Sequence, residues 1–253
     1  MTSAMTSADV PWLSSKTGQF RYFHQQLDSP DWSRLAILDF GGNVGNLLDD
    51  AAARIDPAQY SCLDVCAAAI EVGRRKYPAA HWVFYDRYNC CFNRAGIPQL
   101  PLPALDRRFD CILAYSVFTH VLPSEMQELI AALSSRLASG GRLAFTFIDP
   151  QHESWPARPG CSNLQWRLER ASGAGGKRAG ADAIARTRGA AWFALVDDVE
   201  LLIEDESMPP GAGRGGTSFH VFHSLELIRR LYPGCTVLPP VCGEMQHCCV
   251  LDG

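Results

Sequence analysis

The sequence has no apolar run approaching the ~20 residues that a helix needs to span a bilayer. It also lacks a basic excess, because 23 Lys and Arg residues stand against 27 Asp and Glu residues, giving a net charge of -4. These absences argue against a membrane partner and against nucleic-acid binding through a global positive field. The first residues show no basic stretch followed by an apolar one, so we expect no signal peptide.

The ten cysteines include no CxxC pair. Several lie within apolar runs, as Cys111 does, which favours small buried hydrophobic side chains in a reducing compartment over a disulfide framework or a zinc site. We therefore predict a cytoplasmic protein. His220 and His223 stand three residues apart, but no acidic ligand at suitable spacing accompanies them, so we predict no metal site.

What is present indicates a globular fold. Of 253 residues, 47% are hydrophobic and 20% are charged, which is ordinary for a packed domain. Short apolar runs alternate with helical stretches, and strands joined in this way form a doubly wound, mostly parallel α/β sheet. The expected strands cover residues 35–40, 59–65, 81–85, 109–115 and 142–148. The expected helices between them cover residues 46–55, 67–77 and 124–137.

The alternation breaks at Pro150. We therefore expect an insertion that forms a substrate lid, with a hairpin in it and a mobile Gly/Ala-rich loop. The predicted organisation is an N-terminal helical segment (1–30), a cofactor-binding core (31–149), the insertion (150–216) and a C-terminal helix and strands that complete the core sheet (217–253). The expected hairpin covers 191–203, the mobile loop 171–181, and the last helix and strands 224–231, 236–238 and 246–251.

A glycine-rich turn lies between the first expected strand and helix, with the sequence Asp39-Phe40-Gly41-Gly42-Asn43-Val44-Gly45. Glycines let the backbone approach a ligand closely, and the next helix offers backbone N–H groups. Asp64 ends the following strand about 20 residues on, where its carboxylate can accept both hydroxyls of a ribose. The glycine-rich turn and Asp64 together predict a site for a nucleoside-containing cofactor. The alternative is that the glycines are needed only for the packing of the turn.

In these residues the sequence resembles the class I S-adenosylmethionine (SAM)-dependent methyltransferases. Segments similar to the family's five motifs follow in order over about residues 34–149, namely Ile37–Gly45, Leu63–Val65, Tyr85–Asp86, Phe109–His120 and Gly140–Phe147. The resemblance implies a seven-stranded sheet with its last strand antiparallel and SAM lying across the carboxyl ends of the first strands. Asn43 departs from the family pattern, which has glycine there. A nicotinamide cofactor is disfavoured by the absence of a Tyr-x-x-x-Lys pair and of the three-glycine dinucleotide spacing.

The resemblance also implies roles for individual residues. Asp39 and Gly41 would hold the methionine amine, Asp64 the ribose, and Asp86 the adenine amine with Tyr85 or Arg87 beside the ring. Further residues expected at the cofactor are Gly42, Asn43, Gly45, Val65, Tyr115 and Ser116.

Two histidines are candidates for proton transfer. His120 lies four residues beyond Ser116, and a neutral imidazole there could deprotonate an acceptor. The alternative is that His120 caps the turn or packs beside SAM. His223, at the start of the last helix, is the second candidate. Tryptophans in the insertion suit either an apolar lid over an organic acceptor or a small core of the insertion's own.

The resulting expectation is methyl transfer from SAM to an O or N atom of a small organic molecule, in specialised metabolism. A peptide or protein methyltransferase and a catalytically silent SAM-fold subunit are the alternatives. The sequence does not fix the oligomeric state.

Overall fold

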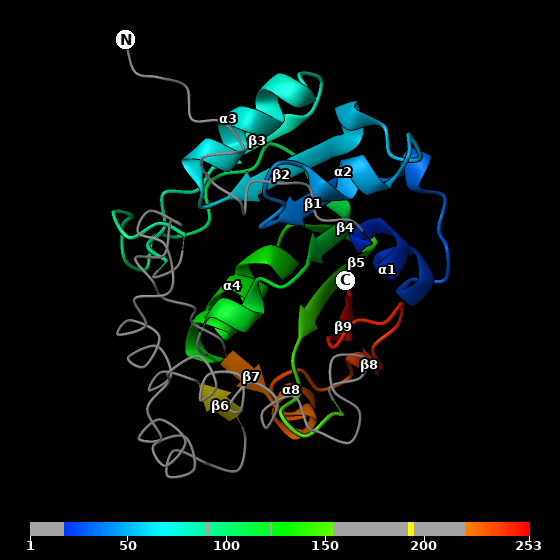
Figure 1. Cartoon of the computed structure of the whole chain (residues 1–253), viewed down its shortest axis with the longest axis vertical. Coiled ribbons are helices and arrows are strands. Elements are labelled where there is room, and N and C mark those ends of the chain that lie inside the picture. The colour runs from blue at the N-terminus through cyan, green and yellow to red at the C-terminus, as the bar shows by residue number, and fades with distance from the viewer. Residues whose placement is uncertain (1–17, 90–91, 122, 154–191, 195–220) are drawn as a thin grey trace.

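The protein is described as a computed structural model (Figure 1), covering residues 18–89, 92–121, 123–153, 192–194 and 221–253. Seven strands form one sheet in the order β3-β2-β1-β4-β5-β9-β8. The first five strands are mutually parallel and β9 runs antiparallel to its neighbours, so the predicted doubly wound sheet is confirmed. The strands are β1 (Ile37–Phe40), β2 (Tyr60–Asp64), β3 (His81–Phe84), β4 (Phe109–Ala114), β5 (Leu137–Phe147), β8 (Thr236–Leu238) and β9 (His247–Asp252).

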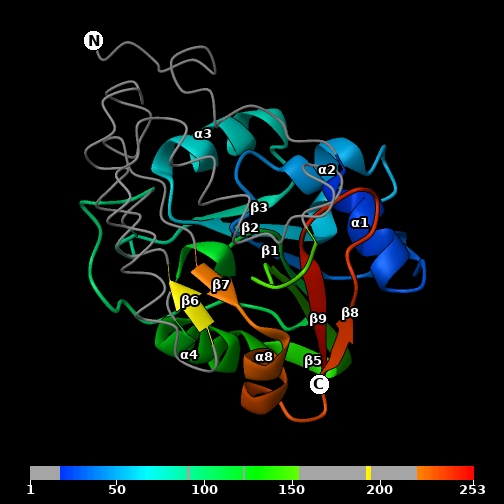
Figure 2. The same ribbon diagram turned by 60° about the horizontal axis from the view of Figure 1, so that its bottom comes forward.

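Helices cover both faces of this sheet, giving three layers (Figures 1 and 2). One face packs against α1, α2 and α3 through a core that includes Phe23, Leu47 and Ile70. The other face packs against α4 and α8 through a core that includes Leu129 and Ile228. The helices are α1 (Gln19–Gln26), α2 (Asn46–Asp50), α3 (Ala67–Lys76), α4 (Pro123–Ser134) and α8 (Leu225–Leu231).

The central strands are buried along their whole length, which explains their near-continuous apolar sequences. All four residues of β1 and all five of β2 are buried. The two carboxylates of these strands, Asp39 and Asp64, stand toward the carboxyl ends, where a ligand site forms in open α/β sheets.

Most boundaries lie within three residues of the sequence-based prediction, as where α4 ends at Ser134 rather than at residue 137, and two differ by five residues. The helix α2 ends at Asp50 rather than at residue 55, because Ala52 and Ala53 take left-handed backbone angles (φ 48° and 66°) that a helix cannot contain. The strand β5 begins at Leu137 rather than at residue 142. It runs through Gly140 and Gly141, and its pairing with β4 shifts register there.

The predicted insertion falls almost entirely outside the described residues, as do the mobile loop at 171–181 and the tryptophans Trp155 and Trp166. Of the predicted hairpin at 191–203, only β6 (Trp192–Ala194) is described. It pairs antiparallel with β7 (Val221–His223), which directly precedes α8. The expected segment boundaries and the lid remain predictions.

In the described part of the chain, no helix has the length and apolar character required to cross a bilayer. Seven cysteines within it are free thiols, five of them buried. The burial of these five agrees with the prediction that cysteines serve as small core side chains.

Candidate functional site

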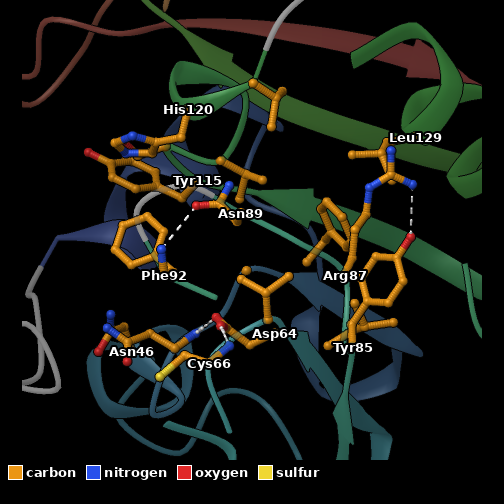
Figure 3. Close-up of a pocket in the computed structure, with 18 of the residues that line it drawn as sticks. Asn46, Asp64, Cys66, Tyr85, Arg87, Asn89, Phe92, Tyr115, His120 and Leu129 are labelled. Atoms are coloured by element: carbon orange, nitrogen blue, oxygen red, sulfur yellow. Dashed lines mark hydrogen bonds between the residues drawn. The ribbon is translucent and has the colours of Figure 1, made fainter. Parts of the chain in front are cut away.

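A cavity of about 370 Å³ opens at the carboxyl edge of the parallel strands (Figure 3). Its walls come from the turn after β1, the ends of β2, β3 and β4, the helices α1 and α4, and the loop before β9. Its size falls in the range of roughly 300–1,000 Å³ typical of small-ligand sites. Eight residues predicted from sequence line it: Gly41, Asn43, Asp64, Val65, Tyr85, Tyr115, Ser116 and His120.

The turn after β1 approaches the cavity with its backbone. Gly41 has φ +76°, and a Cβ there would lie 2.4 Å from Cγ2 of Val117, so a side chain at this position would collide with the turn after β4. Asn43 also takes a left-handed angle, with φ 54°. Asparagine tolerates that conformation better than most residues, which explains how it can replace the glycine of the family pattern.

Asp64 faces the middle of the cavity (Figure 3). Its Oδ2 accepts a hydrogen bond of 2.8 Å from the N–H of Asn43, and its Oδ1 accepts one of 2.8 Å from the N–H of Cys66. Burial raises the pKa of Asp64, while these N–H groups oppose the shift. A carboxylate has about four acceptor sites, so both oxygens retain capacity for a pair of ligand hydroxyls.

Asp39 does not line the cavity, contrary to its predicted contact with a methionine amine. Its carboxylate lies under the glycine turn, where Oδ2 accepts a 2.7 Å hydrogen bond from the Tyr60 hydroxyl and a Cβ on Gly42 would stand 2.5 Å away. Burial raises the pKa of Asp39 to about 7. Because the turn passes over it, Asp39 supports the turn rather than facing a ligand.

Four other predicted site residues also lie outside the cavity wall: Gly42, Gly45, Asp86 and His223. The Asp86 carboxylate accepts a 3.1 Å hydrogen bond from the side chain of Asn93, within its own loop, and its expected contact with adenine stays a prediction. His223 is fully buried, with Nε2 2.8 Å from the carbonyl of Phe118. The prediction that His223 looks into the cleft is therefore wrong for this structure.

One end of the cavity is apolar and closed by a buried arginine (Figure 3). Arg87 is 3% exposed and pairs with Glu125 at 2.9 Å and with Glu128 at 2.8 Å, both on α4. It also donates to the Leu100 carbonyl, which accepts from the Tyr85 hydroxyl as well. These bonds fasten the loop after β3 to α4. Leu63, Val121 and Leu129 supply apolar surface in the same wall.

His120 and Phe92 form another part of the wall (Figure 3). His120 ends the 3-10 turn Phe118–His120 that follows β4, and its ring meets Phe92 edge-on at 5.3 Å between centroids. An imidazole beside an aromatic ring can exchange a proton with a ligand while the ring excludes water.

The sequence analysis missed Glu244, Gln246 and Gln19, which also line the cavity. Glu244 and Gln246 precede β9, which lies on the other side of β1 in the sheet from β3, the strand that Arg87 follows. Glu244 is hydrogen-bonded to the Tyr115 hydroxyl, and burial together with this carboxylate raises the Tyr115 pKa. The signal was available in the topology: because β9 is antiparallel, the residues just before it reach the same edge as the carboxyl ends of β1 and β2.

No cluster of His, Cys, Asp and Glu able to hold a metal occurs among the residues with a described placement. The polar groups of the cavity wall are hydroxyls, amides, carboxylates, the imidazole of His120, the guanidinium of Arg87 and the thiol of Cys66.

Comparison with known proteins gives a consistent picture. Residues 38–143 match the family model described as "Methyltransferase domain". Among solved structures, the fold is similar to a glycopeptide N-methyltransferase, MtfA, at 12% identity (TM-score 0.54, 93% of this chain and 89% of that one). It is also similar to an S-adenosylmethionine-dependent methyltransferase from Mesorhizobium loti, at 14% identity (TM-score 0.52, 93% and 99%). The pyocyanin biosynthetic protein PhzM matches at 13% identity (TM-score 0.51, 91% and 54%).

Proposed function

We propose that this chain, a class I SAM-dependent methyltransferase, methylates an O or N atom of a small organic molecule in specialised metabolism. The observation that carries the proposal is the cavity of about 370 Å³ whose wall includes the glycine turn, Asp64 and His120. The similarity to MtfA, a glycopeptide N-methyltransferase, and to PhzM, a pyocyanin biosynthetic protein, supports the natural-product context.

The residues present fit SAM. Asp64 offers both oxygens to the two ribose hydroxyls, and the turn after β1 presents backbone rather than side chains where the cofactor must approach. The apolar wall near Tyr85 and Leu129 suits the adenine ring. In this assignment Gly41, Asn43 and Val65 contact the cofactor from the β1 and β2 side, and Tyr115 and Ser116 from the β4 side.

Bound SAM supplies a sulfonium from which a methyl group leaves readily. The task of the protein is then to align the acceptor atom with the S–CH₃ bond, which can lower a bimolecular barrier by roughly 7–11 kcal/mol. Phe92 and Tyr115 exclude water from that region. For a hydroxyl acceptor, His120 takes the proton, whereas an amine needs only to arrive in its neutral form.

The remaining parts of the proposal rest on the chain itself. The proposal that the segment 150–216 forms a substrate lid rests on the broken β/α alternation and the aromatic residues of its sequence, and nearly all of that segment lies outside the described residues. The cytoplasmic location rests on the free thiols of the described residues, which are typical of reducing compartments.

A methyl-transfer assay tests this function. The purified chain is incubated with SAM and a panel of small phenols, alcohols and amines, beside a panel of short peptides, and S-adenosylhomocysteine (SAH) and methylated products are measured by mass spectrometry. We expect product from a small molecule. Product from peptides alone would favour the peptide methyltransferase, and SAM binding without turnover on any acceptor would favour the silent subunit.

A further inference from the structure

Three carboxylates line the cavity in the described part of the chain, and they differ in what neutralises them. Asp64 accepts from two backbone N–H groups. Glu125 pairs with the guanidinium of Arg87. Glu244 is bonded to the neutral hydroxyl of Tyr115, and none of the ion pairs between described residues includes it. The Glu244 end of the cavity therefore carries negative charge that no described cation compensates.

Glu244 is held in place by local structure. It ends a tight turn in which its N–H donates to the Val241 carbonyl at 3.0 Å, and Cys242 and Gly243 take positive φ angles of 57° and 77°. The next residue but one, Gln246, accepts from the Thr146 hydroxyl at 2.5 Å through its side chain and from the Tyr22 hydroxyl at 2.8 Å through its carbonyl. The carboxylate is thus presented by a fixed turn rather than by a loose loop.

The order of the strands sets where this charge lies relative to Asp64. Along the sheet edge, Arg87 follows β3, Asp64 ends β2, Tyr115 follows β4, and Glu244 precedes β9 beyond β5. Asp64 consequently stands between two ends of the cavity. One is apolar and contains Arg87, which is paired with glutamates, and the other is polar and contains Glu244, which has no cationic partner among the described residues.

SAM has a matching asymmetry, since its ribose lies between an uncharged aromatic base and a chain that carries the sulfonium and ends in an α-ammonium and an α-carboxylate on one carbon. With the ribose on Asp64, the two arms must extend in opposite directions along the edge. The base suits the apolar end, and the ammonium suits Glu244. The resemblance assigns the ammonium to Asp39 and Gly41. Asp39 is shut off beneath the turn, and Gly41, which lines the cavity, has no charged side chain to offer.

We propose that Glu244, oriented by the Tyr115 hydroxyl, is the anionic contact for the α-ammonium group of SAM. The inference rests on the proposed function, because it takes the ribose position on Asp64 as its origin. An ammonium group on a methyl acceptor has the same chemistry, so the test must separate the two sources.

Two ligands that differ only in the amino-acid part make this separation. SAH carries the ammonium, whereas 5′-methylthioadenosine keeps the nucleoside and the sulfur without it. Their dissociation constants are measured by calorimetry on the wild-type chain, on Glu244→Gln and on Glu226→Gln. Glu226 is an exposed residue of α8 outside the cavity wall, so it is a control with the same chemical change. Circular dichroism checks that each variant is folded.

We expect Glu244→Gln to weaken SAH binding at least about tenfold, as for loss of a charged hydrogen bond, and to leave methylthioadenosine binding within about twofold. The control should change neither. Equal weakening of both ligands would overturn the proposal by showing an indirect structural effect. Unchanged binding of both, with or without a raised KM for an amine acceptor, would overturn it as well. A wild-type chain that binds neither ligand would contradict the proposed function itself.

Discussion

The N–H of Asn43, in the turn after β1, donates a 2.8 Å hydrogen bond to the Asp64 carboxylate at the end of β2. The two strands are neighbours in parallel register, with Phe40 opposite Leu63. Two motifs that are 21 residues apart in sequence therefore act as one unit, and a ligand held by Asp64 also lies against the glycine turn.

Asp39 gives a prediction about pH. Its pKa in the folded protein is about 7 because of burial, against 3.8 ordinarily, so between these values the folded state holds a proton that the unfolded state has lost. The free energy of unfolding should therefore contain a contribution from Asp39 that falls as pH rises from about 4 to about 7 and is then constant.

The variant Asp39→Asn isolates this contribution, because its amide oxygen can still accept from Tyr60 but cannot titrate. Urea unfolding of both proteins across pH 4.5–8 gives the difference in free energy. We expect wild type to lose stability relative to the variant by on the order of a few kcal/mol over this range. A difference independent of pH would show that Asp39 is ionised throughout.

His120 is predicted to act on the acceptor rather than on the cofactor. For a hydroxyl acceptor, His120→Ala should lower kcat by at least about 100-fold, the lower end of general-base effects, while the SAM dissociation constant changes little. Steady-state kinetics and calorimetry measure the two quantities. Preserved kcat with weakened SAM binding would instead make His120 part of the cofactor wall, the alternative that its packing on Phe92 also permits.

His223 should matter for stability and not for turnover. Because the Phe118 carbonyl can only accept a hydrogen bond, the Nε2 atom of His223 carries a hydrogen and donates it to that bond. Burial lowers the pKa of His223 from 6.5 to about 4. The unfolded chain then binds a proton that the folded one does not, so His223 makes the free energy of unfolding rise with pH between about 4 and 6.5.

In His223→Gln this rise should disappear, because glutamine keeps a donor for the carbonyl but does not titrate. Denaturant unfolding at pH 4.5 and 7 measures the change, and kcat should stay within a few-fold of wild type. A large fall in kcat at unchanged stability would restore His223 as a catalytic candidate.

The architecture could be predicted from sequence because its signals are local. Short buried strands such as Ile37–Phe40 and Tyr60–Asp64 read as continuous apolar runs. Helix ends are also marked, as where Ser224 accepts from the N–H of Leu227 at the start of α8. The early end of α2 could not be predicted, because it depends on left-handed angles at two alanines, for which the sequence carries no signal.

The site was only partly predictable for a different reason. Asp64 and Gly41 were found because each has a fixed place at a strand end. The burial of Asp39 under Gly42 depends on the path of the turn and on Tyr60 of the neighbouring strand. The approach of Glu244 to Tyr115 depends on packing between segments far apart in the chain. The prediction for His223 failed for a similar reason. The position of His223 at the start of the last helix does not decide whether its ring faces the cavity or the core.

The most direct test of the account is the affinity of SAH for wild type and for Asp64→Ala, measured by calorimetry. The exposed Asp106, which is not in the cavity wall, serves as the control in Asp106→Ala. Loss of the shared acceptor of the ribose hydroxyls should cost about 1.5–3 kcal/mol, or roughly 10- to 150-fold in affinity, with no change in the control. Unchanged SAH affinity in a folded Asp64→Ala variant would contradict the assignment of this cavity to SAM.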